Sequence, residues 1–175
     1  MKRTLTISFL LFAAFCLMNF TFTSGCYSFK DIGTIPDTIK TVKVEFISNQ
    51  APYVNPQLSP NLTDRIKQKI NQTKLTLVNN DNADWILSGT IRDYSVTTTG
   101  ISSANGQKQN SINRLTVGVH VIINKRKANL VEEFDVSRSF DFGATQSLQS
   151  AEAQLLDEMV KNLTDEIFNH IFSNW

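Results

Sequence analysis

Two consecutive segments in the second half of the chain constrain the fold more than any other feature. The stretch NRLTVGVHVIINK, which begins at Asn113, alternates apolar and polar side chains, and LVEEFDVSRSFDF, which begins at Leu130, does the same. The apolar phase comprises Leu115, Val117, Val119, Val121 and Ile123 in the first segment and Phe134, Val136, Phe140 and Phe142 in the second. A period of two indicates strands with one buried face. Because only the turn 125–129 separates them, we predict an antiparallel hairpin whose apolar face needs a cover.

Two predicted helices can supply that cover. From about Ser150 to Ser173 there is no Gly or Pro, and apolar residues recur at spacings of three and four, which predicts a long amphipathic helix. Its apolar residues are Leu155, Leu156, Met159, Val160, Leu163, Ile167, Phe168, Ile171 and Phe172. A shorter helix is predicted to start with Ser59 as the cap and Pro60 at the first helical position. The apolar face of this shorter helix comprises Leu62, Ile66 and Ile70.

Two further strands are predicted in the first half of the chain. Residues 41–48 alternate, so Val42, Val44 and Phe46 are expected to be buried. A second strand is predicted from about Asp84 to Val96, and its apolar phase changes near Gly89. A bulge or a close backbone approach near that glycine would account for the change. The polar stretch 97–111 is predicted to be a long hairpin loop.

The order of these elements predicts the fold class. A chain of 175 residues is long enough for one compact domain. With the order β-α-β-β-β-α, the chain is predicted to form an α+β, two-layer sandwich. Its sheet would be four-stranded and mostly antiparallel, with both helices on one face and a more polar opposite face. We expect this single domain to span residues 41–175.

The amino end carries an export signal. Lys2 and Arg3 precede an almost unbroken apolar segment, Ile7–Met18, and small residues follow. A permanent membrane-spanning helix needs about 20 apolar residues, which is more than this segment offers. A basic start, a short apolar core and small residues are typical of a cleaved signal peptide.

The end of this signal resembles the lipobox of bacterial lipoproteins, because Ser24-Gly25 leads directly into Cys26. The resemblance implies a signal peptide over residues 1–25, lipid attachment at Cys26 and a lipidated tether over residues 26–40. Several acyl chains on one residue hold a protein at a membrane far longer than a single chain does. The alternative is an ordinary signal peptide followed by a free cysteine.

Charge and cysteine content argue against a nucleic-acid-binding protein and against a fold held by disulfides or by a cysteine metal site. Without residues 1–25, the chain has 15 basic and 16 acidic residues, so it lacks the basic excess of a nucleic-acid-binding protein. Lipid attachment at Cys26 would leave no thiol for a disulfide or for a metal site.

The sequence offers no motif for catalysis, a metal or a cofactor. His120 is predicted on the outward face of a strand and His170 near the end of the last helix, and neither belongs to a ligand or triad pattern. Glu132-Glu133 and Asp157-Glu158 are adjacent pairs, whose side chains point in different directions on a strand or a helix. We therefore expect a protein that is not an enzyme and binds no cofactor.

Six segments, taken in order along the chain, carry a family resemblance. They are GCYSF, IPDTIKTVKVEFISNQA, LSPNLTDRIKQKI, ADWILSGTIRDYSV, NRLTVGVHVI and LTDEIFNHIFSNW. Together they resemble the LptE family of lipopolysaccharide-assembly lipoproteins, in the form found in Bacteroidota. The resemblance covers nearly all of the predicted mature chain, and the 97–111 stretch is its poorest match.

The resemblance implies two helices packed on a four-stranded sheet, and it implies a function. Members of the family are anchored in the outer membrane, facing the periplasm, and plug the large β-barrel LptD. Together the two proteins place lipopolysaccharide in the outer leaflet. The expected partners are thus an LptD-type β-barrel, lipopolysaccharide and the membrane itself. The alternative is a free-standing, periplasm-facing lipoprotein that binds or ferries a lipid or another cell-envelope component.

Basic residues are the candidate contacts for such partners. The turn Lys125-Arg126-Lys127 could meet the phosphates of lipid A or an acidic rim of a partner, since charge-assisted hydrogen bonds favour these contacts. A solvated hairpin tip is the alternative. Arg92 and Arg114 lie on predicted strands and could add a cationic patch on the open face of the sheet.

Overall fold

The computed structural model describes residues 35, 37–99 and 112–173. The predicted signal peptide, Cys26, most of the predicted 97–111 loop and Trp175 lie outside the described residues. The elements are β1 (Thr41–Val44), β2 (Ser48–Asn49), α2 (Leu58–Asn71), β3 (Thr76–Leu77), β4 (Trp85–Thr99), β5 (Ile112–Lys125), the short 3-10 helix Arg126–Ala128, β6 (Leu130–Gly143) and α3 (Leu148–Ser173).

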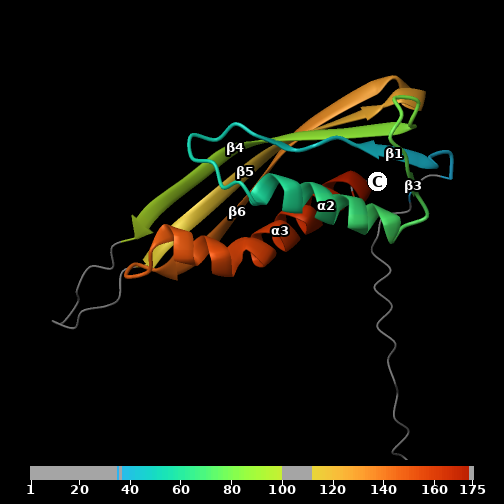
Figure 1. The fold of residues 1–175 in the computed structure, drawn as a ribbon. Helices are drawn as coiled ribbons and strands as arrows, with labels where there is room; N and C mark the ends of the chain where they lie inside the picture. Colours follow the sequence, from blue (N-terminus) through green and yellow to red (C-terminus); the bar gives the residue numbers. More distant parts are fainter. Residues whose placement is uncertain (1–34, 36, 100–111, 174–175) are drawn as a thin grey trace, which may run out of the picture. The chain divides into compact units, whose positions relative to one another are not determined.

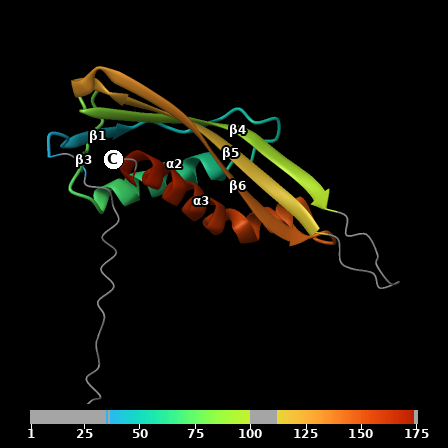
Figure 2. The same cartoon turned by 180° about the vertical axis from the view of Figure 1, so that it is seen from behind.

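The described strands form one mixed sheet in the order β3-β1-β4-β5-β6, and β2 also pairs with β4 (Figure 1). β4, β5 and β6 are antiparallel, whereas β1 and β2 run parallel to β4, and β3 runs parallel to β1. Both helices cover the same face of the sheet, as the view from behind also shows (Figure 2). The predicted α+β class with two helices is confirmed.

The prediction of four mostly antiparallel strands is wrong in detail. The sheet has six strands, because Ser48–Asn49 and Thr76–Leu77 pair as short additional strands. Strands of two residues show no alternation, so a pattern of period two cannot reveal them.

The first strand is interrupted where the sequence predicts continuity. Val44 pairs with Leu87 and Ser48 with Thr90, so one extra residue lies between these pairs on the β1–β2 side. The extra residue reverses the phase of the side chains. Phe46, which we expected to be buried, is therefore 63% exposed, and Ile47 takes the buried position.

A β-bulge changes the phase of β4. Ile91 pairs with Val119 and Asp93 with Gly118, which leaves Arg92 as the extra residue, so Tyr94 joins the buried face. The bulge lies three residues beyond Gly89. The close approach predicted at Gly89 is confirmed, because a Cβ there would lie 3.3 Å from the backbone oxygen of His120.

The start of α2 also differs from the prediction. The helix begins at Leu58, with Gln57 as the cap residue, so Ser59 is not the cap. Asn55 holds the cap residue in place instead, because its Oδ1 accepts a hydrogen bond of 2.9 Å from the backbone N–H of Gln57. Pro60 is the third helical residue. Any position in the first turn suits proline, since none of these N–H groups has a partner within the helix.

The core lies between the sheet and the two helices. All five predicted apolar residues of β5 are at most 1% exposed, and the apolar faces of α2 and α3 pack against them. The opposite face of the sheet is more polar, as predicted. Ile35 and Ile39 are also buried, so the packed part of the chain begins before Thr41.

Candidate functional site

The turn between β5 and β6 is held by Asp84, which immediately precedes β4. The Asp84 carboxylate accepts hydrogen bonds from the backbone N–H groups of Lys40, at 2.8 Å, and Thr41, at 3.0 Å. It also forms an ion pair of 2.9 Å with Lys127 Nζ. The Arg126 backbone N–H donates to the Asp84 backbone carbonyl. We call these five residues the Asp84 cluster; it joins the starts of β1 and β4 to the β5–β6 turn.

The Asp84 carboxyl group is held in its ionised form. Burial alone would raise its pKa, but the backbone N–H of Lys40, the Lys127 ammonium and Thr41 together bring the pKa well below its usual range. The cluster therefore contains a fixed negative charge among the basic side chains of the turn.

The three basic residues of the turn do not share one surface. Lys125 points to the helix side of the sheet, where its side chain is 8% exposed, 2.7 Å from Glu132 and 5.3 Å from the centre of the Trp85 ring. The Lys127 side chain is 54% exposed, and its Nζ also donates to the Thr38 backbone carbonyl. Arg126 is exposed and donates to the Asp81 backbone carbonyl.

Arg92 and Arg114 do not form one patch. Arg92 is exposed at the bulge of β4. Arg114 pairs in register with Thr97, five residues farther along β4, and its guanidinium contacts both oxygens of Asp141, at 2.7 and 2.9 Å. The hydrogen bond from Arg114 lowers the pKa of Asp141. The positive charge of Arg114 and the negative charge of Asp141 therefore compensate each other on the open face.

The histidines contact nearby side chains. His120 lies on the open face, as predicted, but it is buried, with Nδ1 2.8 Å from Asp135 Oδ1 and Nε2 3.5 Å from Glu133 Oε2. His170 stacks on Phe134, with 3.8 Å between ring centres. In residues 37–99 and 112–173, no group of His, Cys, Asp and Glu has an arrangement that could hold a metal ion.

A buried polar cluster surrounds Glu152, which is 8% exposed, and the sequence did not predict it. Tyr94 donates a hydrogen bond of 2.6 Å to Glu152 Oε1, and Tyr53 donates one of 3.2 Å to Oε2. The two tyrosine rings stack, and Asn55 Nδ2 lies 3.5 Å from the Tyr94 oxygen. Burial, followed by the hydrogen bond to Glu152, raises the pKa of Tyr94. This Glu152 cluster joins α3 to β4 and to the loop before α2.

One sequence signal could have indicated the Glu152 cluster. Glu152 stands between Ala151 and Ala153 at the start of a predicted amphipathic helix, three residues before the apolar residue Leu155. A carboxylate at a buried helical position needs a donor. The sequence does not show that the donors are tyrosines from β4 and from the preceding loop.

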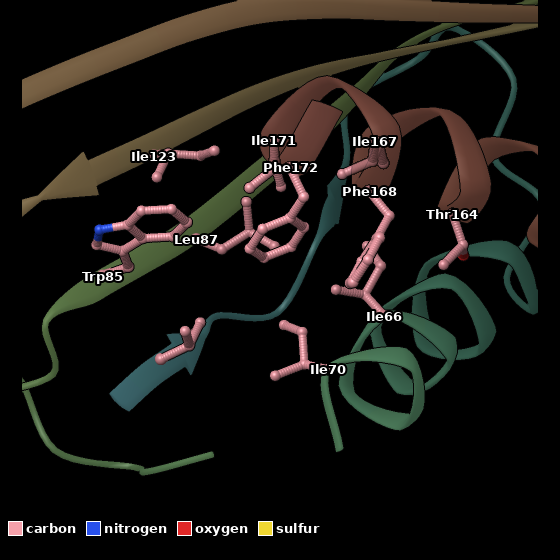
Figure 3. A pocket seen from close by; sticks show the side chains of 11 residues that line it. Ile66, Ile70, Trp85, Leu87, Ile123, Thr164, Ile167, Phe168, Ile171 and Phe172 are labelled. Carbon is pink, nitrogen blue, oxygen red and sulfur yellow. The ribbon is translucent and has the colours of Figure 1, made fainter. Parts of the chain in front are cut away.

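An apolar cavity lies where the last turns of α2 and α3 meet the sheet (Figure 3). Trp85, Phe168 and Phe172 are among its lining residues, and Trp85 stacks on Phe172 with 5.7 Å between ring centres. Its volume is about 10 Å³. The Thr164 hydroxyl at this cavity has no hydrogen-bond partner among the described residues. A space of this size holds at most one water molecule.

Neither described helix combines the length and the apolar composition that crossing a bilayer requires. Among solved structures, a putative neuraminyllactose-binding hemagglutinin homolog from Helicobacter pylori is similar, with 8% identity and a TM-score of 0.53 over 83% of this chain and 87% of that chain. At this identity the likeness concerns the fold alone. Rare lipoprotein B from Shewanella oneidensis has 14% identity and a TM-score of 0.47 over 75% of this chain and 93% of that chain.

No curated protein matches the chain. The model of the LptE family, described as lipopolysaccharide-assembly, matches residues 39–171. The match extends from the segment before β1 into the last turn of α3, and it confirms the resemblance predicted from the sequence. The chain therefore belongs to the LptE family of lipopolysaccharide-assembly proteins.

Proposed function

We propose that the protein is an outer-membrane lipoprotein that plugs and stabilises an LptD-type β-barrel and assists the insertion of lipopolysaccharide into the outer leaflet. Family membership over residues 39–171 is the observation that carries this proposal, since it assigns the chain a role in lipopolysaccharide assembly. The protein would act through its shape and its surface, without catalysis.

Lipid attachment at Cys26 would hold the domain at the periplasmic face of the outer membrane. In this proposal residues 1–25 are removed, and residues 26–40 connect the acyl chains to the domain. Ile35 is packed in the core, so eight residues separate it from Cys26. An extended chain of that length spans about 30 Å, so the start of β1 and the adjacent Asp84 cluster stay near the membrane surface.

Basic side chains would contact the phosphates of lipopolysaccharide or an acidic part of the barrel. Arg126 and Arg92 are exposed and are the first candidates; Lys127 is exposed as well, but it forms an ion pair with Asp84. Lys125 and Arg114 would contribute only after leaving Glu132 and Asp141, with which they form ion pairs. Charge-assisted hydrogen bonds to phosphate are the physical basis of these contacts.

The alternative of a free-standing lipid carrier receives no support from the core. A carrier would need a cavity that holds an acyl chain, and the apolar cavity beside Trp85 has a volume of about 10 Å³. A space of that volume holds at most one water molecule and no acyl chain.

Affinity purification from native membranes tests the proposal. Membranes that contain the tagged chain would be extracted with a mild detergent, and the purified material analysed by mass spectrometry. We expect a stoichiometric LptD-type β-barrel with the wild-type chain, and we expect Cys26→Ala to abolish the acyl modification of the chain that mass spectrometry detects. Recovery of the wild-type protein from the outer membrane without a barrel would overturn the plug and leave the anchor intact.

A further inference from the structure

A hollow of about 300 Å³ lies at the edge of the sheet, between the last part of β6 and α3. At this end of the molecule β6 and the first turns of α3 lie side by side (Figure 2). Sites for small ligands begin at about this volume, so the hollow has room for a small ligand. The residues that line it come from three elements: Arg114 of β5, Ser139, Phe140 and Asp141 of β6, and Leu155 and Glu158 of α3.

An ion pair forms one wall of the hollow. Arg114 lies opposite Asp141 in the β5–β6 register, and its Nε and Nη2 donate to the two carboxylate oxygens. The pair occupies two of the five N–H groups of the guanidinium and one lone pair on each oxygen. The two side chains are 50% and 46% exposed. Both residues can therefore bind a ligand while they remain paired.

Other groups around the hollow add hydrogen-bonding positions and an apolar side. The Ser139 hydroxyl lies 2.9 Å from that of Thr116, and a hydroxyl can form more than one hydrogen bond. Glu158 is exposed and has no hydrogen-bond or ion-pair partner among the described residues. Leu155 is partly buried against the core, and with Phe140 it supplies the apolar side.

The charges around the hollow disfavour an anion. The hydrogen bond from Arg114 lowers the pKa of Asp141, so this carboxyl group is ionised at neutral pH and compensates the guanidinium. Glu158 adds a negative charge that no described residue compensates. A phosphate would have to displace Asp141 from Arg114 and remain beside Glu158. An uncharged ligand meets neither obstacle.

A sugar ring has the chemistry that this hollow accepts. It is uncharged, its hydroxyl groups both donate and accept hydrogen bonds, and its faces present C–H groups. The hydroxyl groups of a ring can accept from Arg114 and donate to Asp141 or Glu158. The C–H groups can pack on Leu155.

Short hydroxyl side chains continue from the hollow across the open face of the sheet. Ser139 lies opposite Thr116, and Thr116 lies opposite Ser95 on β4. Ser95 and Ser139 are exposed, and Thr116 is partly exposed. This row carries no charge, so it can hydrogen-bond further sugar rings beyond the one in the hollow.

We propose that this hollow is a binding site for an uncharged saccharide. The site follows from residues of this chain, whereas the source of the saccharide rests on the proposed function, which makes the uncharged sugars of lipopolysaccharide the ligand. The site gives Arg114 a role that does not require it to leave Asp141. Phosphates are left to basic side chains elsewhere, such as Arg126 and Arg92.

Binding to the full chain, purified in detergent, tests the site by ligand-detected NMR, which also covers weak binding. The probes are the saccharide that mild acid releases from lipopolysaccharide, a glycan fragment of peptidoglycan, and inorganic phosphate. We expect the first probe to bind, and Glu158→Ala to weaken its binding about tenfold, since a hydrogen bond to a charged group is lost. Asp157→Ala is the matched control and should leave binding unchanged, because Asp157 is exposed on the same helix and does not line the hollow.

Glu158→Gln separates an uncharged ligand from a cationic one. The amide oxygen still accepts a hydrogen bond from a sugar hydroxyl, so this variant should bind the saccharide more tightly than Glu158→Ala does. An amine would lose its counter-charge in both variants. Equal losses in Glu158→Gln and Glu158→Ala would therefore overturn the assignment of an uncharged ligand.

Two further results would overturn the site itself. One is equal binding of the saccharide by Glu158→Ala and the unsubstituted chain, and the other is displacement of the saccharide by an equal concentration of inorganic phosphate. Binding of the peptidoglycan fragment alone would support the site and exclude lipopolysaccharide as its source. The barrel partnership is measured separately, by purification from native membranes, so recovery of the barrel without any saccharide binding would contradict this site and leave the proposed function standing.

Discussion

The Asp84 cluster and the Glu152 cluster join connecting segments to β4 at two places, by different chemistry. Asp84 precedes the strand and is surrounded by backbone N–H groups and by Lys127, whose side chain is 54% exposed. Glu152 is buried against Tyr94, which is ten residues farther along, and its donors are neutral phenols. A buried carboxylate that loses a donor cannot turn to water, whereas a partly exposed cluster can. The Glu152 cluster should therefore be the more sensitive of the two.

The largest effect is expected for Tyr94→Phe, because this substitution removes the hydroxyl that donates to Glu152 at 2.6 Å. A buried carboxylate left short of a donor costs about 2–3 kcal/mol of the free energy of unfolding. Urea unfolding followed by circular dichroism measures the loss. Tyr53→Phe is the matched control, because its hydrogen bond to the same carboxylate is longer and its side chain is 45% exposed. Equal losses of the free energy of unfolding in the two variants would show that burial of the donor tyrosine does not determine the size of the loss.

Asp84→Asn should cost less, about 1–2 kcal/mol, since the amide oxygen can still accept hydrogen bonds from Lys40 and Thr41 while the ion pair with Lys127 is lost. The same unfolding measurement applies. Asp81→Asn is the control, because Asp81 is strongly exposed and is expected to change stability little. A larger loss for Asp84→Asn than for Tyr94→Phe would reverse the ranking of the two clusters.

The two clusters should also lose their contributions to stability at opposite ends of the pH scale. The pKa of Asp84 is lowered on folding, so its contribution to stability is complete above the unfolded pKa, near 4, and is lost as pH falls. The pKa of Tyr94 is raised, so its contribution is complete below the unfolded pKa, near 10, and is lost as pH rises. The free energy of unfolding should be measured across pH. Asp84→Asn should weaken its dependence on pH in the acid range only, and Tyr94→Phe should weaken it in the alkaline range only. A change on the other side in either variant would contradict these assignments.

The sequence predicts the long strands and helices of this fold, but it predicts the two clusters only in part or not at all. The alternation in β5 and β6 and the spacing in α3 report local burial, and local burial is what a periodic pattern records. The change of phase in β4 was visible in the sequence near Gly89, but the residue that bulges, Arg92, and the change of register before Phe46 depend on which strand lies alongside. The basic turn was visible in the sequence, but its attachment to Asp84 joins residues about 40 positions apart. The Glu152 cluster was not predicted, because its donors come from two other elements.

The smallest expected effect is a gain, and it concerns a polar group that belongs to neither cluster. In both clusters the buried polar atoms are paired, whereas the Thr164 hydroxyl is buried beside the apolar cavity without a partner among the described residues. Thr164→Val keeps the branched shape and removes the unpaired hydroxyl, so it should raise the free energy of unfolding by about 1 kcal/mol. Thr63→Val is the matched control and should lower it, because the Thr63 hydroxyl accepts a hydrogen bond from Ile47 and donates to the Ser59 carbonyl. A loss in Thr164→Val would mean that this hydroxyl has a partner after all, and that pairing of buried polar groups extends beyond the two clusters into the cavity.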